Sequence, residues 1–416
     1  MTTMTHFRRR AIKVIATALI AATALAATGC EGAAKTPDSA ESAGGRGQLV
    51  SAEHLRSYTT EDVRTELTDN GFDASTTQFG VETYRLVYRT IDPGGQATTA
   101  SGLLALPGGV EHELSIVEYE HGTQPTKSEA PSVAADSGDV AVALTYAAAG
   151  FAGVVPDYLG LGLGPGRHPY LDVPSETTAS LDMLRAARTE AAALDRKLGG
   201  KVYITGFSQG GPAAMGLARA LQQGADSAWR PAAIAAISGP LDMRTAELPA
   251  ALDHILDPAS AGFYAAYLLV SWNHLHQLYS SPSEVFQPPY DATMDQLFDG
   301  THTTDELHQG LPGSIDQLLT PHAVDMLRNP TGPLADALRI ADSTCTDWTP
   351  QLPIRLYVGD MDTDVAADNS AQCRAALQQH GVDAPVFDLG PVDHNGSGIG
   401  ATAQAVRWFT QLEAEK

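Results

Sequence analysis

The segment that most constrains this chain is Lys201–Gly211, where a short run of β-branched and aromatic residues ends in Gly-x-Ser-x-Gly. An alanine-rich helical run, Pro212–Leu221, follows at once. A serine on so sharp a turn has a strained backbone, and Gly206 and Gly210 have no Cβ that would clash with it. The order of strand, serine turn and helix predicts that Ser208 is a catalytic nucleophile. The alternative is a glycine-rich turn without a function.

A serine hydroxyl is a poor nucleophile unless a base removes its proton and a carboxylate orients that base. When the serine stands between a strand and a helix, the acid and then the histidine follow it in the chain. Three carboxylates follow the apolar run Ile354–Val358 and compete for the role of acid: Asp360, Asp362 and Asp364. His394 follows the next predicted strand on a glycine-rich loop and is the candidate base. A solvent-exposed histidine is the alternative.

The Asp-x-Asp-x-Asp spacing of these aspartates is also found in calcium loops. An EF-hand needs glycine at its sixth position and glutamate at its twelfth, and Val365 and Ala371 stand there instead. An EF-hand is therefore excluded, and a looser cation site remains the alternative. The histidines between 274 and 322 have no second pair of ligands at zinc-like spacing, so the sequence predicts no zinc site.

Ester hydrolysis builds negative charge on the carbonyl oxygen, and preorganised backbone N–H groups must face that oxygen. One donor is expected to be Gln209, directly after the nucleophile. The other is expected in the loop after an early strand, where Thr123 is the candidate. His121 in the same loop is expected to brace the loop rather than to act as a base.

Strands and helices alternate along most of the chain. The strands expected after a hairpin over Gln78–Ile91 and Ala97–Leu106 are Leu114–Tyr119, Phe151–Val155, Val202–Thr205, Ala232–Ile237, Ile354–Val358 and Val386–Leu389. The helices expected between and after them are Val140–Ala149, Thr178–Leu198 with Ser175 as a plausible N-cap, Ala366–Gln379 and Ala401–Leu412. This order predicts an α/β fold with a mostly parallel central sheet covered by helices on both faces.

A long interval between Gly239 and Leu352 interrupts the alternation. It is too long for a simple loop and contains the apolar aromatic helix Ala261–Leu278. We interpret it as a mainly helical cap over the active site, with a second independent domain as the alternative. The predicted divisions are a signal peptide (1–29), a flexible tether (30–50), a core in two pieces (51–240 and 350–416) and a cap insertion (241–349).

The N-terminus reads as an export signal. Arg8–Arg10 and Lys13 precede the short apolar run Val14–Ala27, which is too short to span a membrane comfortably. Small residues before Cys30 resemble a bacterial lipobox, so Cys30 is the predicted lipidation site. The alternative is an ordinary signal peptide, and the paired arginines match twin-arginine export loosely.

The net charge and the cysteine content limit which partners and which compartment suit this chain. The net charge of −23 makes nucleic acid an unsuitable partner. Only Cys345 and Cys373 follow Cys30, and in an exported protein two such cysteines favour a disulfide. A membrane is expected as a partner only through the N-terminal lipid.

Four segments together resemble the α/β-hydrolase superfamily and, within it, the secreted bacterial and fungal lipases and esterases: His121–Thr123, Pro156–Gly162, His168–Tyr170 and Gly206–Gly211. The likeness covers about Thr77 to the C-terminus. It implies the α/β-hydrolase fold, serine carboxylester hydrolysis without metal or organic cofactor, and a cap over the acyl pocket.

The resemblance also implies a triad of Ser208, Asp362 and His394, because Asp362 has the family's usual spacing from Gly359 and Val365. The apolar cap helix favours a hydrophobic acyl pocket for lipid or aryl esters, with ordinary cap packing as the alternative. The rival functions are a peptidase or acyltransferase on the same fold, and a non-catalytic surface-binding lipoprotein.

Overall fold

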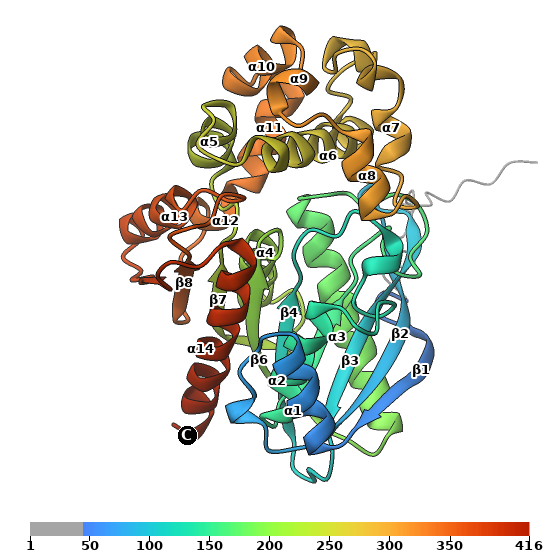
Figure 1. The fold of residues 1–416 in the computed structure, drawn as a ribbon. Helices are drawn as coiled ribbons and strands as arrows, with labels where there is room; N and C mark the ends of the chain where they lie inside the picture. The colour runs from blue at the N-terminus through green and yellow to red at the C-terminus, as the bar shows by residue number, and fades with distance from the viewer. Residues whose placement is uncertain (1–44, 416) are drawn as a thin grey trace, which may run out of the picture. The chain divides into compact units, whose positions relative to one another are not determined.

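The computed structural model describes residues 45–415. The predicted signal peptide, Cys30 and most of the predicted tether lie outside the described residues. The described chain forms a nine-stranded sheet in the order β1-β2-β3-β5-β4-β6-β7-β8-β9 (Figure 1). Its strands are β1 Leu49–Tyr58, β2 Val81–Ile91, β3 Ala97–Pro107, β4 Leu114–Glu120, β5 Ala152–Pro156, β6 Leu198–Phe207, β7 Arg230–Ile237, β8 Ile354–Val358 and β9 Val386–Asp388.

The sheet is mostly parallel. The first three strands and β5 pair antiparallel, and every pairing from β5 through β4 to β9 is parallel. The carboxyl ends of the parallel strands therefore lie along one edge, which is where α/β proteins place their sites.

Helices cover both faces. One face packs against α1 Thr60–Asp69, α2 Gly138–Ala148 and α14 His394–Ala414, and the other against α3 Val173–Ala193, α4 Gly210–Gln222 and α13 Asp368–Gln379. Successive strand residues alternate between these two layers: Ile116 belongs to the α3 and α4 layer, and Val117 to the α2 and α14 layer. Because both faces are buried, the central strands read as nearly continuous apolar runs.

Between β7 and β8 the chain forms a group of helices at one end of the sheet (top of Figure 1). They are α5 Leu248–Leu252, α6 Pro258–His276, α7 Met294–Leu297, α8 Thr304–Gly310, α9 Ile315–Leu318, α10 Pro321–Arg328 and α11 Gly332–Ala341. They enclose an apolar core of their own, centred on Trp272, Phe286 and Leu318. The structure thus has the helical insertion expected from the sequence, while the divisions near 240 and 350 stay predictions.

Two N-terminal elements differ from the sequence expectation. The tether was predicted to reach Val50, but β1 begins at Leu49, and neither β1 nor α1 was expected. Most of β1 is exposed and pairs only with β2, so its sequence lacks the apolar alternation that marks a half-buried strand.

The boundaries of two helices were also predicted wrongly. Asp172 rather than Ser175 caps α3, by accepting a hydrogen bond from the Ser175 backbone N–H. The helix ends at Ala193 rather than Leu198, because Asp195 takes a positive φ of 57° and the Arg196 N–H donates back to the Ala191 carbonyl (2.7 Å). The expected C-terminal helix begins at His394 instead of Ala401. Glycines in the first turns of α14 lower helix propensity and conceal its start.

Among residues 45–415, no helix combines the length and hydropathy needed to cross a bilayer. Cys345 and Cys373 form a disulfide with a Cα–Cα distance of 5.2 Å, which confirms the predicted pairing. The bridge joins the short helix α12 Ser343–Thr346 to α13, beside the strand that leads to Asp362.

Candidate active site

Ser208 lies at the sharp turn between β6 and α4, with a positive φ of 55°. Its backbone N–H donates to the carbonyl of Ile237 at the end of β7 (2.9 Å). A Cβ on Gly206 would lie 1.9 Å from the carbonyl oxygen of Gly210, and one on Gly210 would lie 1.9 Å from that of Glu120. Only glycine fits at either position, so the motif shapes the turn that presents the serine.

The structure brings the three predicted triad residues together. The Ser208 hydroxyl lies 2.9 Å from Nε2 of His394, and Nδ1 of His394 lies 2.8 Å from Oδ2 of Asp362. His394 is the first residue of α14, and its ring packs on Phe207 with the ring centroids 4.7 Å apart. The Asp393 side chain caps that helix by accepting from the Gly396 N–H (2.8 Å), which fixes the backbone at the histidine.

Of the three competing aspartates, Asp362 makes the contact with His394. Its other oxygen accepts from the backbone N–H groups of Asp364 (2.9 Å) and Val365 (3.0 Å). Burial alone would raise the pKa of Asp362, but the hydrogen bond and charge of His394, together with these backbone donors, outweigh burial and lower it. Asp362 is therefore an anion whose orientation is fixed on both sides.

The alternative cation site finds no support in the described part of the chain, where no group of three or more His, Cys, Asp or Glu side chains is arranged to hold a metal. Asp360 is exposed at the surface, and its backbone N–H donates to the Gly390 carbonyl.

A buried polar network anchors Gln209, the first oxyanion candidate. Its side-chain amide donates to Oε1 of Glu176 (2.7 Å) and to Nε2 of His168 (2.8 Å). Nδ1 of His168 donates to the Leu159 carbonyl (2.9 Å), which leaves Nε2 as an acceptor. Burial lowers the pKa of His168 to about 3, so the ring is neutral and suited to this role.

Thr123, the second oxyanion candidate, lines a cavity together with Ser208. Its hydroxyl lies 3.2 Å from the hydroxyl of Tyr170, whose ring stacks on Tyr267 of α6 with centroids 4.2 Å apart. His121 is buried, and Nδ1 of its ring donates to the Gly122 carbonyl (2.7 Å), a contact within the same loop.

Two cavities meet at Ser208. One is an apolar space of about 50 Å³ beneath the insertion, lined mainly by α5, α6 and the turn before them. The other, of about 390 Å³, is lined by α2, the start of α14 and the loop around Thr123. His394 lines the larger cavity, and Gln209 lines the apolar one.

Sequence reasoning missed Glu247, a buried carboxylate that lines the apolar cavity. One of its oxygens accepts from the Ala366 N–H (3.1 Å) and from the Asn369 side chain (2.6 Å), in the segment just after Asp362. Burial, opposed by these hydrogen bonds, raises the pKa of Glu247 to about 7. No local motif marks it, because its partners lie more than a hundred residues away in the chain.

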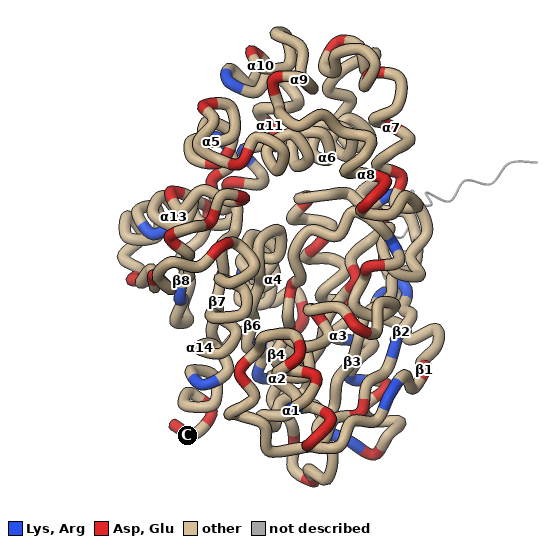
Figure 2. Tube along the Cα trace, viewed as in Figure 1, with Lys and Arg blue, Asp and Glu red and all other residues tan. Residues whose placement is uncertain are grey.

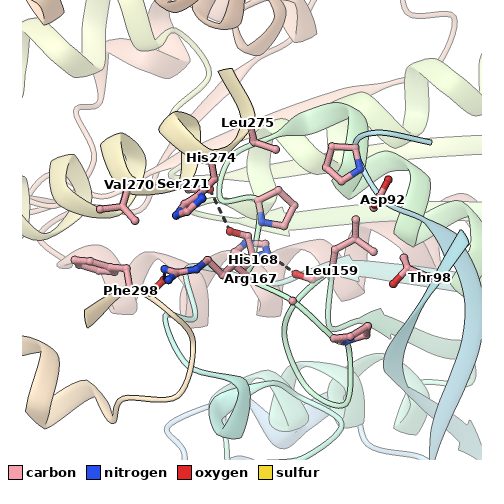
Figure 3. Close-up of a pocket in the computed structure, with 14 residues that line it drawn as sticks. Asp92, Thr98, Leu159, Arg167, His168, Val270, Ser271, His274, Leu275 and Phe298 are labelled. Carbon is pink, nitrogen blue, oxygen red and sulfur yellow. Dashed lines mark hydrogen bonds between the residues drawn. The ribbon is translucent and has the colours of Figure 1, made fainter. Parts of the chain in front are cut away.

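A third cavity, of about 320 Å³, is lined by His168 and by residues of the loop that precedes it (Figure 3). It is bounded by α6 and the turn between β2 and β3. Arg167 and His274, which line it, both bond to Asp295 (3.2 and 2.6 Å). Arg167 and His274 therefore share one carboxylate partner, Asp295, which is not among the residues that line the cavity.

No protein-family model matches the chain, and no curated protein does either. Solved structures do. A protein from Legionella pneumophila assigned as a hydrolase has 25% identity and a TM-score of 0.80, with 88% of this chain and 99% of that one covered. The rice cell wall degrading esterase LipA from Xanthomonas oryzae has 28% identity and a TM-score of 0.77, with 89% and 99% covered.

Candida antarctica lipase A is more distant, with 15% identity, a TM-score of 0.60, and 84% of this chain and 78% of that one covered; this likeness shows the fold alone. The hydrolase and esterase neighbours support an ester hydrolase. The chain therefore has the α/β-hydrolase fold and resembles the lipases and esterases built on it.

Proposed function

We propose that this protein is a serine carboxylester hydrolase that works through an acyl-enzyme intermediate. The observation that carries the proposal is the unbroken line of hydrogen-bond distances from Ser208 through His394 to Asp362, 2.9 and 2.8 Å. The esterase neighbours support ester rather than amide bonds as the substrate, since fold alone does not decide chemistry.

In the proposed reaction, Nε2 of His394 takes the Ser208 proton while Oγ attacks the ester carbonyl carbon. The backbone N–H groups of Gln209 and Thr123 stabilise the negative carbonyl oxygen. The bond to the alcohol breaks, and the alcohol oxygen receives the proton from Nε2. Water then gives a proton to Nε2 and attacks the acyl carbon, and the Ser208 oxygen regains the proton as the acid leaves.

The apolar cavity is the proposed acyl site. Leu252 and Leu268 from the insertion line it together with Ser208, so an apolar acyl group bound there would exclude water. Most of the other residues that line it are also apolar, so it suits the hydrocarbon part of an acyl group.

Export and anchoring remain part of the proposal. The disulfide is typical of an oxidising compartment. Signal cleavage and lipidation at Cys30 rest on the sequence alone. Mass spectrometry of the mature protein, expressed in a bacterial host with and without Cys30→Ser, tests lipidation directly, because an unmodified Cys30 contradicts it.

A fluorophosphonate probe, a series of p-nitrophenyl esters and matched peptide anilides test the reaction. We expect an adduct on Ser208 and turnover of the esters but not of the anilides. Ser208→Ala should abolish both, whereas Ser227→Ala, at an exposed serine, should change neither. Amide cleavage without ester preference would favour the peptidase. Ester consumption that requires an added alcohol acceptor would favour the acyltransferase. A folded protein that forms no adduct would favour the binding lipoprotein.

A further inference from the structure

We propose, building on the ester hydrolase function above, that the site prefers esters whose alcohol carries a positive charge, such as a quaternary ammonium group. The inference concerns the larger of the two cavities that meet at Ser208. It rests on the place of this cavity relative to His394, on its charged groups and on its aromatic lining.

The position of His394 identifies this cavity as the alcohol side. The leaving oxygen must receive its proton from Nε2 of His394, so the alcohol departs on the side where that ring is accessible. His394 lines the 390 Å³ cavity and is not among the residues that line the apolar cavity. The acyl group then occupies the apolar cavity, and the alcohol occupies the larger one.

The charged groups of the alcohol side are negative. Asp364 lines both cavities, as Ser208 does, and Asp139 lines the larger one. Asp139 accepts from the Tyr119 hydroxyl (2.9 Å) and from the Gln124 amide (2.8 Å), both neutral donors that do not cancel its charge. Among the described residues that line this cavity there is no Lys or Arg.

The charge of the whole chain acts in the same direction, with 49 Asp and Glu against 26 Lys and Arg. Acidic residues are spread over both the sheet domain and the helical insertion (Figure 2). The field of the molecule therefore favours the approach of cations, and the cavity walls focus it near the nucleophile.

Aromatic rings supply the second part of a site for an ammonium group. Phe72, Tyr119, Phe207 and Tyr264 all line the cavity. Aromatic faces attract quaternary ammonium groups. Such a group has no N–H donor, so it gives up no hydrogen bonds to water when it enters the cavity. Carboxylates and aromatic faces both repel negative charge, so the cavity should favour esters of cationic alcohols over esters of anionic alcohols.

Acetylcholine and 3,3-dimethylbutyl acetate form the matched pair for a test. They have the same shape and the same acetyl group, and they differ in one positive charge. At low ionic strength we expect kcat/KM for acetylcholine to exceed that for the neutral ester by about tenfold, equivalent to about 1.4 kcal/mol. The ratio should fall as salt screens the exposed part of the attraction.

Asp364→Asn should bring this ratio below about three, and Asp383→Asn, which removes the same charge at an exposed site outside the cavity, should preserve it. A wild-type ratio of one or less overturns the proposal, and an unchanged ratio in Asp364→Asn overturns its assignment to this cavity. If neither ester is hydrolysed and the probe leaves Ser208 unlabelled, the ester hydrolase function itself fails. The wild-type pair decides the question even if a variant does not fold.

Discussion

Replacing Asp362 by asparagine should be more damaging than its small change in size indicates. In the native protein, one Asp362 oxygen accepts from two backbone N–H groups, and the other accepts from Nδ1 of His394. The asparagine oxygen will keep the two backbone donors, which turns the amide NH₂ towards His394. Nδ1 must then accept, so the ring proton moves to Nε2, where it blocks proton uptake from Ser208.

The expected loss in kcat is on the order of 10⁴, which corresponds to about 5.4 kcal/mol of transition-state stabilisation. The assay is steady-state hydrolysis of p-nitrophenyl acetate, normalised to the concentration of folded protein measured by circular dichroism. Asp360→Asn is the matched control, because it makes the same change at an exposed carboxylate two residues away. Retention of a tenth of the native kcat in Asp362→Asn, or a larger loss in Asp360→Asn, would refute this reasoning.

Three further predictions concern the turn, the Gln209 anchor and the buried acid. Gly206→Ala should cost at least about 3 kcal/mol of stability, measured by denaturant unfolding, because its Cβ would overlap a carbonyl oxygen. Gly138→Ala is the control and should cost nothing, because a Cβ there would have no atom within 4 Å. Glu176→Ala should lower kcat by about tenfold with KM little changed, because it removes one of the two acceptors that hold the Gln209 amide. Glu176→Gln should recover most of the loss by keeping an acceptor, and equal effects of the two would contradict the anchor. Glu247 has a raised pKa of about 7, so its charged form destabilises the fold, and stability should fall as pH rises from about 4.5 through 7. Glu247→Gln should therefore raise the unfolding midpoint at pH 8 and change it much less at pH 5, and a shift of equal size at both would refute the titration.

The fold and the candidate nucleophile could be predicted because their signals are local. The strand, the glycine-flanked serine and the helix are consecutive in sequence, and steric necessity at Gly206 and Gly210 enforces the spacing. His394 and Asp362 could be predicted because each follows a strand of the parallel sheet, whose carboxyl ends share one edge. The triad geometry thus follows from topology more than from pairwise chemistry.

The elements that escaped prediction lack such local signals or carry weak ones. Exposure along β1 removes the apolar periodicity. The helix α1 did carry a signal, a capping box between Thr59 and Asp62, which a search for start signals would have found. The hydrogen bonds of the Gln209 side chain to Glu176 and of Glu247 to Asn369 join residues that are 33 and 122 positions apart in the chain. No motif or periodicity in a single sequence marks such distant contacts.

The buried acid also links substrate access to the triad. Glu247 lies in the turn that leads into the helical insertion, and its carboxylate holds Ala366 and Asn369 in the segment that follows Asp362. The Asn369 side chain in turn accepts from the backbone N–H of Asp242 (2.9 Å) at the root of the same turn. The loop that orients the histidine and the base of the insertion are therefore one hydrogen-bonded unit. The start of α6 belongs to this unit as well, because the backbone N–H of Asp257, its N-cap, donates to the Thr363 carbonyl (2.9 Å). We therefore expect any opening of the apolar cavity to occur in the insertion beyond Asp257, because a hinge nearer the sheet would break these bonds and free the loop that holds Asp362.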